Sequence, residues 1–215
     1  MSFLNQLKSQ AQALQSEKIS QQTDHSASIR LTEAAAKTAW LYLVELAKQL
    51  NVIGPNGPKL SVVNKMPWPD MKLVDFRIDA RKKLLNNQEV YDYIVMAWQI
   101  VPCEGPPVPG SVSANFPPDL DRIEARLSAG SVKHERVEER HPEKKTLQAI
   151  RFDYQTEARG SVTITADHEA GQLGFRLANV QGFEVASTRY PSQMIQSRVL
   201  DELAKLIVGQ ASSFV

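Results

Sequence analysis

The chain has 215 residues and a mass of 24.0 kDa, and its 25 lysine and arginine residues almost balance its 24 aspartate and glutamate residues. A composition of 42% hydrophobic and 23% charged residues is typical of a folded globular protein and excludes wholesale disorder. The net charge of +1 argues against electrostatic capture of nucleic acid as the main activity. The single cysteine excludes a disulfide framework and a cysteine-based zinc site.

The N-terminus lacks the basic and then apolar pattern of a signal peptide. The longest uncharged apolar stretch, residues 93–103, is too short to span a bilayer. We therefore expect a cytoplasmic protein of bacterial character without a membrane span.

Two helices are predicted at the N-terminus, separated by a polar linker at residues 19–26. The first, at residues 2–17, carries a thin apolar stripe at helical spacing, formed by Phe3, Leu4, Leu7, Ala11 and Leu14. This stripe could dock on the body, pair with a partner helix or lie on a membrane, and we favour docking. The second helix, at 27–50, is apolar over much of its circumference, which predicts burial. Residues 1–26 would then precede a single domain at 27–215.

Trp68 is held between Pro67 and Pro69, which fix an extended backbone on both sides of the indole. Such a rigid aromatic residue could form a recognition loop, or it could plug the core. The plug is the favoured interpretation because tryptophan is mostly buried in folded proteins.

A long β-hairpin is predicted next. Residues 72–82 alternate apolar and charged side chains, while the return strand at 90–101 is apolar on both faces and should be central in its sheet. The proline-rich segment 102–118 predicts no regular structure and is a candidate sub-boundary of the domain. A short helix is expected at 119–129.

Five strands joined by short turns are predicted after residue 130, which indicates an antiparallel meander. They span residues 131–140, 146–156, 161–167, 172–179 and 183–189. Nine of the fifteen residues at 131–145 are charged, so the first of these strands should be an edge strand. The low charge of residues 160–191 predicts interior strands or a surface that something else covers. An amphipathic helix that opens at Pro191 follows and should pack across the sheet.

The expected fold class is therefore α+β: an antiparallel sheet, made of the long hairpin and the five-stranded meander, packed against a C-terminal helix, with two helices at the N-terminus. A sheet on a long last helix is similar in outline to the helix-grip fold of small-ligand-binding proteins, and this resemblance implies a cavity between sheet and helix. Here the helices precede the hairpin, whereas that fold places a helix pair between its first two strands.

No catalytic, metal or cofactor site is predicted. His134 and His141 flank one strand but would lie on opposite faces of it, which argues against a zinc site. Asp167, His168 and Glu169 are explained as a polar turn. Asp75, Asp79 and Asp92 would cancel the field of Arg77 and Arg81, so we expect no nucleic-acid partner.

The first functional hypothesis is a non-enzymatic protein-interaction or oligomerisation module, whose partner-binding residues would be Phe3, Leu7, Leu14 and Trp68. The alternative is a small apolar ligand-binding protein or enzyme with a cavity between the sheet and the C-terminal helix. That cavity would be lined by Trp98, Phe152, Phe175 and Met194. For these four residues, plain core packing is the simpler interpretation.

Overall fold

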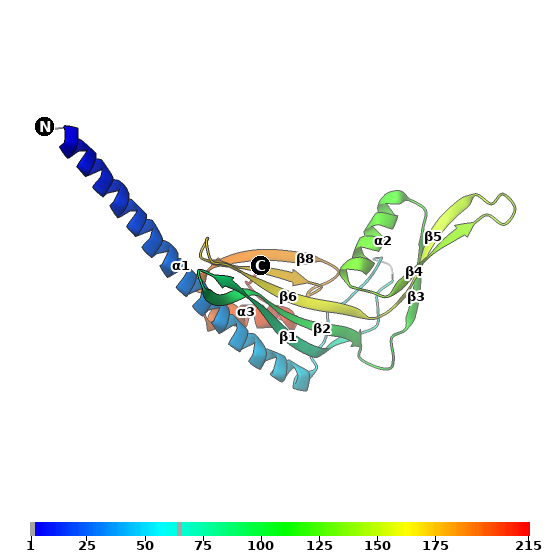
Figure 1. Ribbon diagram of the computed structural model, residues 1–215. Coiled ribbons are helices and arrows are strands. Elements are labelled where there is room, and N and C mark those ends of the chain that lie inside the picture. The colour runs from blue at the N-terminus through cyan, green and yellow to red at the C-terminus, as the bar shows by residue number, and fades with distance from the viewer. Residues whose placement is uncertain (1–2, 64–65) are drawn as a thin grey trace.

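The computed structural model describes residues 3–63 and 66–215; between residues 3 and 24 it gives the helix and, of the side chains, only those of Lys8 and Gln12. The elements in chain order are α1 (Phe3–Ile53), β1 (Met71–Leu85), β2 (Gln88–Pro102), β3 (Pro109–Ala114), α2 (Pro117–Ala129), β4 (His134–Arg140), β5 (Leu147–Gln155), β6 (Ala158–Asp167), β7 (Gln172–Ala178), β8 (Val185–Pro191), the 3-10 turn η1 (Ser192–Met194) and α3 (Ser197–Ile207). The strands form two antiparallel sheets, with the orders β1-β2-β6-β7-β8 and β3-β5-β4 (Figure 1).

The predicted hairpin is confirmed as β1 and β2. Its two-residue turn is Asn86–Asn87, and both residues have positive φ, 49° and 61°. Asparagine tolerates this left-handed region, and a turn with two such residues matches the twist of the flanking strands. The register of β1 shifts between Val74 and Arg77, where Asp75 has a φ of 56°. As predicted, β2 is an interior strand, because it pairs with β1 on one side and β6 on the other.

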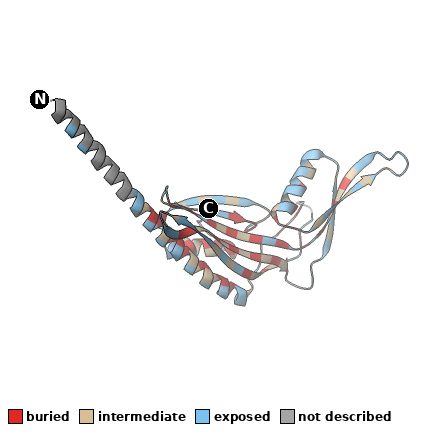
Figure 2. Cartoon of the chain, in the orientation of Figure 1, coloured by how far each residue is buried: buried red, intermediate tan, exposed pale blue. Residues whose placement is uncertain are grey.

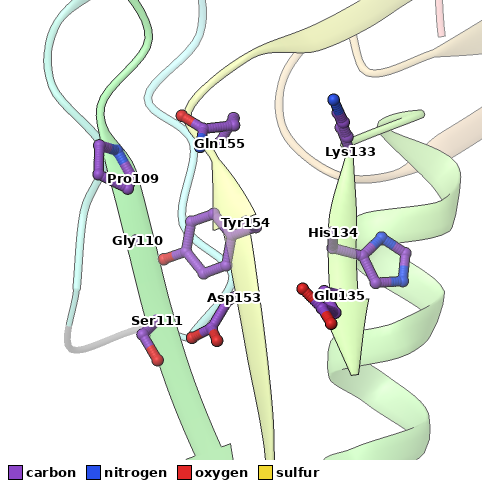
Figure 3. Close-up of a pocket in the computed structure, with 9 residues that line it drawn as sticks. All are labelled: Pro109, Gly110, Ser111, Lys133, His134, Glu135, Asp153, Tyr154 and Gln155. Atoms are coloured by element: carbon purple, nitrogen blue, oxygen red, sulfur yellow. The ribbon is translucent and has the colours of Figure 1, made fainter. Parts of the chain in front are cut away.

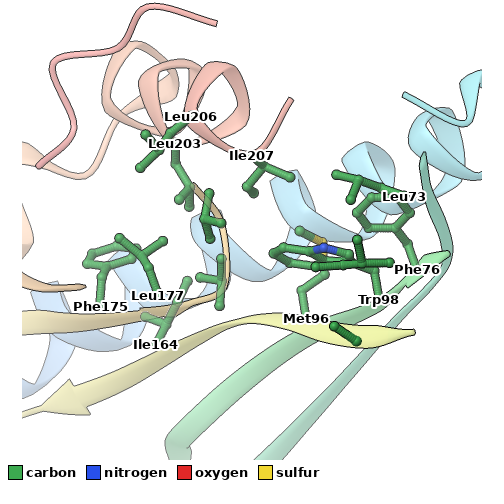
Figure 4. Close-up of a cluster of buried hydrophobic side chains, with 14 of the residues drawn as sticks. Leu73, Phe76, Met96, Trp98, Ile164, Phe175, Leu177, Leu203, Leu206 and Ile207 are labelled. Carbon is green, nitrogen blue, oxygen red and sulfur yellow. The ribbon is translucent and has the colours of Figure 1, made fainter. Parts of the chain in front are cut away.

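The main core lies between the five-stranded sheet and the helices α1 and α3. Buried side chains alternate along β2, β6 and β7 (Figure 2), and they meet Leu203, Leu206 and Ile207 of α3 (Figure 4). Helix α1 contributes a stripe of small and large residues that includes Ala39 and Leu43, neither of which is exposed to solvent. The C-terminal helix therefore packs across the sheet, as the sequence pattern predicts.

The prediction of two N-terminal helices is wrong, because α1 is one continuous helix of 51 residues. It runs through residues 19–26, which the polarity of the sequence marks as a linker. That segment contains no glycine or proline, and the other polar residues each disfavour a helix by no more than about 0.7 kcal/mol. A run of polar residues without a helix breaker is therefore compatible with an uninterrupted helix.

The predicted five-stranded meander is divided between the two sheets. Strands β4 and β5 pair with β3, whereas β6, β7 and β8 continue the sheet of the hairpin. Strand β3 forms inside the proline-rich segment that was expected to be irregular. It does so as an edge strand on β5, where Pro109 is its first residue and proline is tolerated. Strand β4 is the opposite edge, as its charge density predicts.

Candidate functional site

The first half of α1 extends away from both sheets as a single rod (Figure 1). Three predicted partner-binding residues, Phe3, Leu7 and Leu14, belong to this half, and their side chains lie outside the described residues. The exposed side chains of Lys8 and Gln12 are also in this half, and Ile29 is the first buried residue among those of α1 whose burial is described. The docking on the body that we favoured for this segment is therefore not the arrangement of the helix.

The second half of α1 is anchored to the body by polar contacts as well as by its apolar stripe. The Asn51 side chain receives a hydrogen bond from the Phe76 N–H at 2.7 Å and donates one to the Phe76 carbonyl at 2.9 Å. Glu33 accepts from the Tyr91 N–H at 2.8 Å. Tyr42 donates to Asp201 of α3 at 2.6 Å, and burial together with this carboxylate raises the pKa of the Tyr42 hydroxyl. These contacts fix the direction in which the free half projects.

Trp68, the fourth predicted partner-binding residue, lies elsewhere. Its side chain is buried, its indole stacks on Tyr154 with the ring centroids 5.8 Å apart, and it meets the edge of Phe183 at 5.2 Å. The backbone N–H of Trp68 donates a hydrogen bond to the Leu60 carbonyl. Trp68 is thus buried, as the plug interpretation expects, and it packs against Tyr154 of the small sheet. It therefore does not form one surface with the three predicted partner-binding residues of α1.

The four residues predicted to line a ligand cavity are not brought together. Trp98 and Phe175 are at most 2% exposed and lie in the core under the helices (Figure 4). Trp98 stacks on Phe76 at 5.4 Å, and Phe175 meets Tyr190 edge-on. Aromatic neighbours thus occupy the space that a ligand would need.

The other two lie apart from this core centre. Phe152 is on β5, in the small sheet, and its ring centroid lies 6.2 Å from that of the His134 imidazole. Met194 belongs to η1 and is 52% exposed. The last helix was predicted to open at Pro191 and would have included Met194. The chain instead forms a 3-10 turn there, and α3 begins only at Ser197.

A depression of about 420 Å³ crosses the small sheet, and its lining includes Ser111, Glu135 and Asp153 (Figure 3). Ser111, Asp153 and Glu135 lie opposite one another on β3, β5 and β4 and therefore share one face. Arg151 donates to Asp153 at 3.0 Å and to Glu139 at 3.3 Å, so the carboxylate of Asp153 is already paired.

His134 has an imidazole that could act as a general base, but this imidazole does not face the carboxylates of Asp153 and Glu135. His134 is in register with Tyr154, on the opposite face from Asp153 and Glu135. Its Nδ1–H donates to the Val132 carbonyl at 2.8 Å. Burial raises the pKa of the Tyr154 hydroxyl, which makes it a poor acid or base near neutral pH. Within the described residues, no group of three histidine, cysteine or carboxylate side chains is placed to hold a metal ion.

Two buried residues carry structural roles that the sequence did not indicate. His168, expected in a polar turn, is 3% exposed; its Nε2–H donates to the Tyr91 carbonyl at 2.9 Å, and its own carbonyl accepts from Ser28 of α1. Phe214, near the C-terminus, is 1% exposed and packs on Phe175 at 5.2 Å. A histidine in a turn and a phenylalanine in a short tail have no periodicity, so no pattern could have found them.

Comparison with known proteins finds no relative: no protein-family model, no curated protein and no solved structure matches the chain. No helix in the described part of the chain combines the length and the apolar character needed to cross a membrane.

Proposed function

We propose that this chain is a protein-interaction module that self-associates through the projecting half of α1. The observation that carries the proposal is the continuity of α1: a helix about 75 Å long, of which only the second half has a body to pack against. In the part of the chain that the structure describes, no other element covers the first half of the helix.

The sequence of the projecting half supports pairing with a second helix. Leu4, Leu7, Ala11 and Leu14 follow one another at spacings of three, four and three, which is the seam of a two-stranded coiled coil. A narrow stripe of this kind is too thin to seat a helix on a globular core, but it suffices between two helices. An isolated helical segment of this length gains little stability in water without packing. A second copy of the chain supplies the same stripe, so that a symmetric pair buries both.

Anchoring of the second half makes the projecting half a rigid arm. The hydrogen bonds of Glu33 and Asn51 to strand backbone hold the helix to the sheet, and that of Tyr42 holds it to α3. A rigid arm loses little conformational freedom on pairing, which favours association. Catalysis is less well supported, because the polar groups of the small sheet are divided between its two faces.

The test is the solution mass of the full chain by light scattering on a sizing column, over a range of concentrations. We expect the protein to exceed its monomer mass of 24.0 kDa, and a Leu7→Gln/Leu14→Gln variant to return to that mass. A Lys8→Gln/Gln12→Ala variant alters exposed side chains of the same helix segment and should associate like the natural chain. A strictly monomeric natural chain at every concentration would refute the proposal, as would equal association of the Leu7/Leu14 variant.

A further inference from the structure

The face of the five-stranded sheet that points away from α1 and α3 has a surplus of positive charge. Strand register places five exposed arginines on it: Arg77, Arg81, Arg159, Arg176 and Arg189. The same face carries the aspartates Asp75, Asp79 and Asp167, and beside Arg81 it carries the ion pair of Lys83 with Asp92 at 3.0 Å. No strand contributes more than two of these arginines, and β2 contributes none, so the charge balance along the sequence does not reveal the surplus.

Most of these arginines are not neutralised. Arg77 is ion-paired with Asp75 at 2.9 Å. In the part of the chain that the structure describes, the other four have no carboxylate within ion-pair distance. An unpaired guanidinium keeps its donors free for a phosphate or carboxylate ligand and is weakly hydrated, so that it can bind such a group at modest desolvation cost.

One row of residues crosses the whole sheet. Arg81, Tyr93, Thr165, Gly174 and Arg189 lie opposite one another on β1, β2, β6, β7 and β8. Four steps of about 4.8 Å between strands separate the ends of the row by about 19 Å. Arginines therefore stand at both ends, and a partly exposed tyrosine lies beside the first of them.

The middle of the row is open. A Cβ atom added at Gly174 would meet nothing nearer than the Thr165 carbonyl oxygen, at 3.9 Å. A depression of about 510 Å³ lies over this position and is lined by Arg176, Ser187 and Arg189 among others. Two guanidinium groups and a hydroxyl thus border a space that no side chain fills.

We propose that this open face binds single-stranded nucleic acid, laid across the strands along the row from Arg81 to Arg189. The arginines would contact the phosphates, with Arg176 and Arg189 holding one phosphate over Gly174. Tyr93 would stack on an unpaired base. A positively charged sheet face that carries an aromatic residue is the arrangement by which sheets bind single strands, because bases must be unpaired to stack on a protein ring.

The experiment measures binding of a fluorescein-labelled oligothymidylate of about 15 nucleotides by fluorescence anisotropy at several salt concentrations. Replacing Arg176 and Arg189 by glutamine should weaken binding about tenfold at low salt. It should also reduce the slope of log affinity against log salt by about 0.7, since the contact with one phosphate is lost. Tyr93→Leu should weaken binding about fivefold and leave the salt slope unchanged.

An Arg30→Gln/Lys37→Gln variant is the matched control. It removes the same charge from exposed positions of α1, on the other side of the sheet, and should bind like the natural chain. Thermal melting of each variant verifies that the sheet is folded. Failure of the natural chain to bind at low salt, or equal weakening in the control, overturns the proposal. Preference for vesicles containing phosphatidylserine over the oligonucleotide, with the same dependence on Arg176 and Arg189, also overturns it and assigns the face to a membrane surface.

Discussion

The two sheets of this protein use their charged residues in different ways. On the small sheet, cations and carboxylates neutralise one another: Arg151 contacts Asp153 and Glu139, and Arg140 contacts Glu138 at 2.6 Å. On the large sheet, four of the five open-face arginines have no such partner among the described residues. The amount of charge on a sheet therefore says little about its role until the pairing is known.

The sheets also differ in what stabilises them. The large sheet has one face covered by α1 and α3, and its interior residues include Met96, Ile100 and Val162, none of which is exposed. The small sheet buries a smaller set of side chains, which includes Val112, Ile150 and Phe152, and its exposed ion pairs are worth little, about 0–1 kcal/mol each. Most of the free energy of folding should consequently reside in the large sheet and its helices.

The largest expected effect is the loss of the Trp98 side chain from the centre of the large sheet. Trp98→Ala should lower the free energy of unfolding by about 3–5 kcal/mol, since it leaves a cavity beside Phe76. Trp98→Phe keeps a ring in contact with Phe76 and removes an indole N–H that has no partner among the described residues, so it should be milder. Guanidinium denaturation followed by circular dichroism measures both. A cost below about 1 kcal/mol for Trp98→Ala would show that the core is not centred there.

Glycine substitutions compare the two sheets directly and should change the free energy of unfolding by less than Trp98→Ala. Each sheet has a glycine that lies under an aromatic ring. A Cβ atom at Gly160 would lie 2.3 Å from Nε1 of Trp98, and one at Gly110 would lie 2.5 Å from Cε2 of Tyr154. Gly160→Ala should cost about 1–3 kcal/mol, because Trp98 is enclosed by the core. Gly110→Ala should cost less, because Tyr154, although buried against Trp68, also borders the depression of the small sheet, which leaves space on that side of the ring (Figure 3).

Gly182→Ala is the control for this pair, since a Cβ atom there meets nothing within 4 Å. It should change the free energy of unfolding by no more than about 0.5 kcal/mol. Equal costs for Gly160→Ala and Gly110→Ala, measured by the same denaturation experiment, would mean that the two sheets are equally rigid and would remove the contrast drawn above.

The smallest effect concerns pH and the C-terminal segment that covers the large sheet. Glu202 of α3 accepts hydrogen bonds from Lys205 at 2.6 Å and from the Ser213 N–H at 2.8 Å, and these hold the pKa of the Glu202 carboxyl at about 2, below its ordinary 4.5. Because the folded-state pKa is the lower one, the stabilisation is present above pH 4.5 and is lost as the pH falls toward 2. Tyr190 and Phe214 would be loosened first, since the Tyr190 hydroxyl donates to the Phe214 carbonyl next to this contact.

Urea denaturation at a series of pH values measures this effect. Glu202→Gln should lower the urea midpoint at pH 7, and its difference from the natural chain should shrink between pH 4.5 and 2. Glu169→Gln, at an exposed carboxylate of the β6–β7 turn, serves as the control. A difference that stays constant through the acid range would contradict the role given to the Glu202 carboxylate.

Periodicity was a good guide where an element needs only its own residues and one burial face. The hairpin strands, the edge position of β4, the interior positions of β6 and β7 and the apolar stripe of α3 all follow from local patterns. The low charge that predicted interior positions for β6 and β7 predicted one for β8 as well, which is instead an edge of the large sheet. Local patterns also failed where polarity was taken as a sign of a linker at 19–26, and where prolines were taken to exclude a strand at Pro109. In these last two places the backbone can form hydrogen bonds despite the unfavourable composition.

The candidate sites were harder to predict because they depend on pairing between distant strands. Burial in the core was the simpler interpretation for Trp68 and Trp98, and the structure buries both of them beside aromatic neighbours. Nothing in the sequence could show that His134 and Asp153 would share neighbouring strands yet face opposite sides of the sheet. That relation depends on register, which a shift of one residue would reverse.

The near balance of 25 basic and 24 acidic residues is where sequence and tertiary structure differ most. The sequence by itself determined an α+β chain with a long hairpin, an amphipathic last helix and no segment of strong net charge. Only the tertiary structure decided that α1 leaves the body as an arm and that β2 pairs with β6, which brings arginines of β1, β6, β7 and β8 onto one face. The physical reason is that charge is counted along the chain, whereas electrostatic fields depend on distances in space, and strand pairing sets those distances.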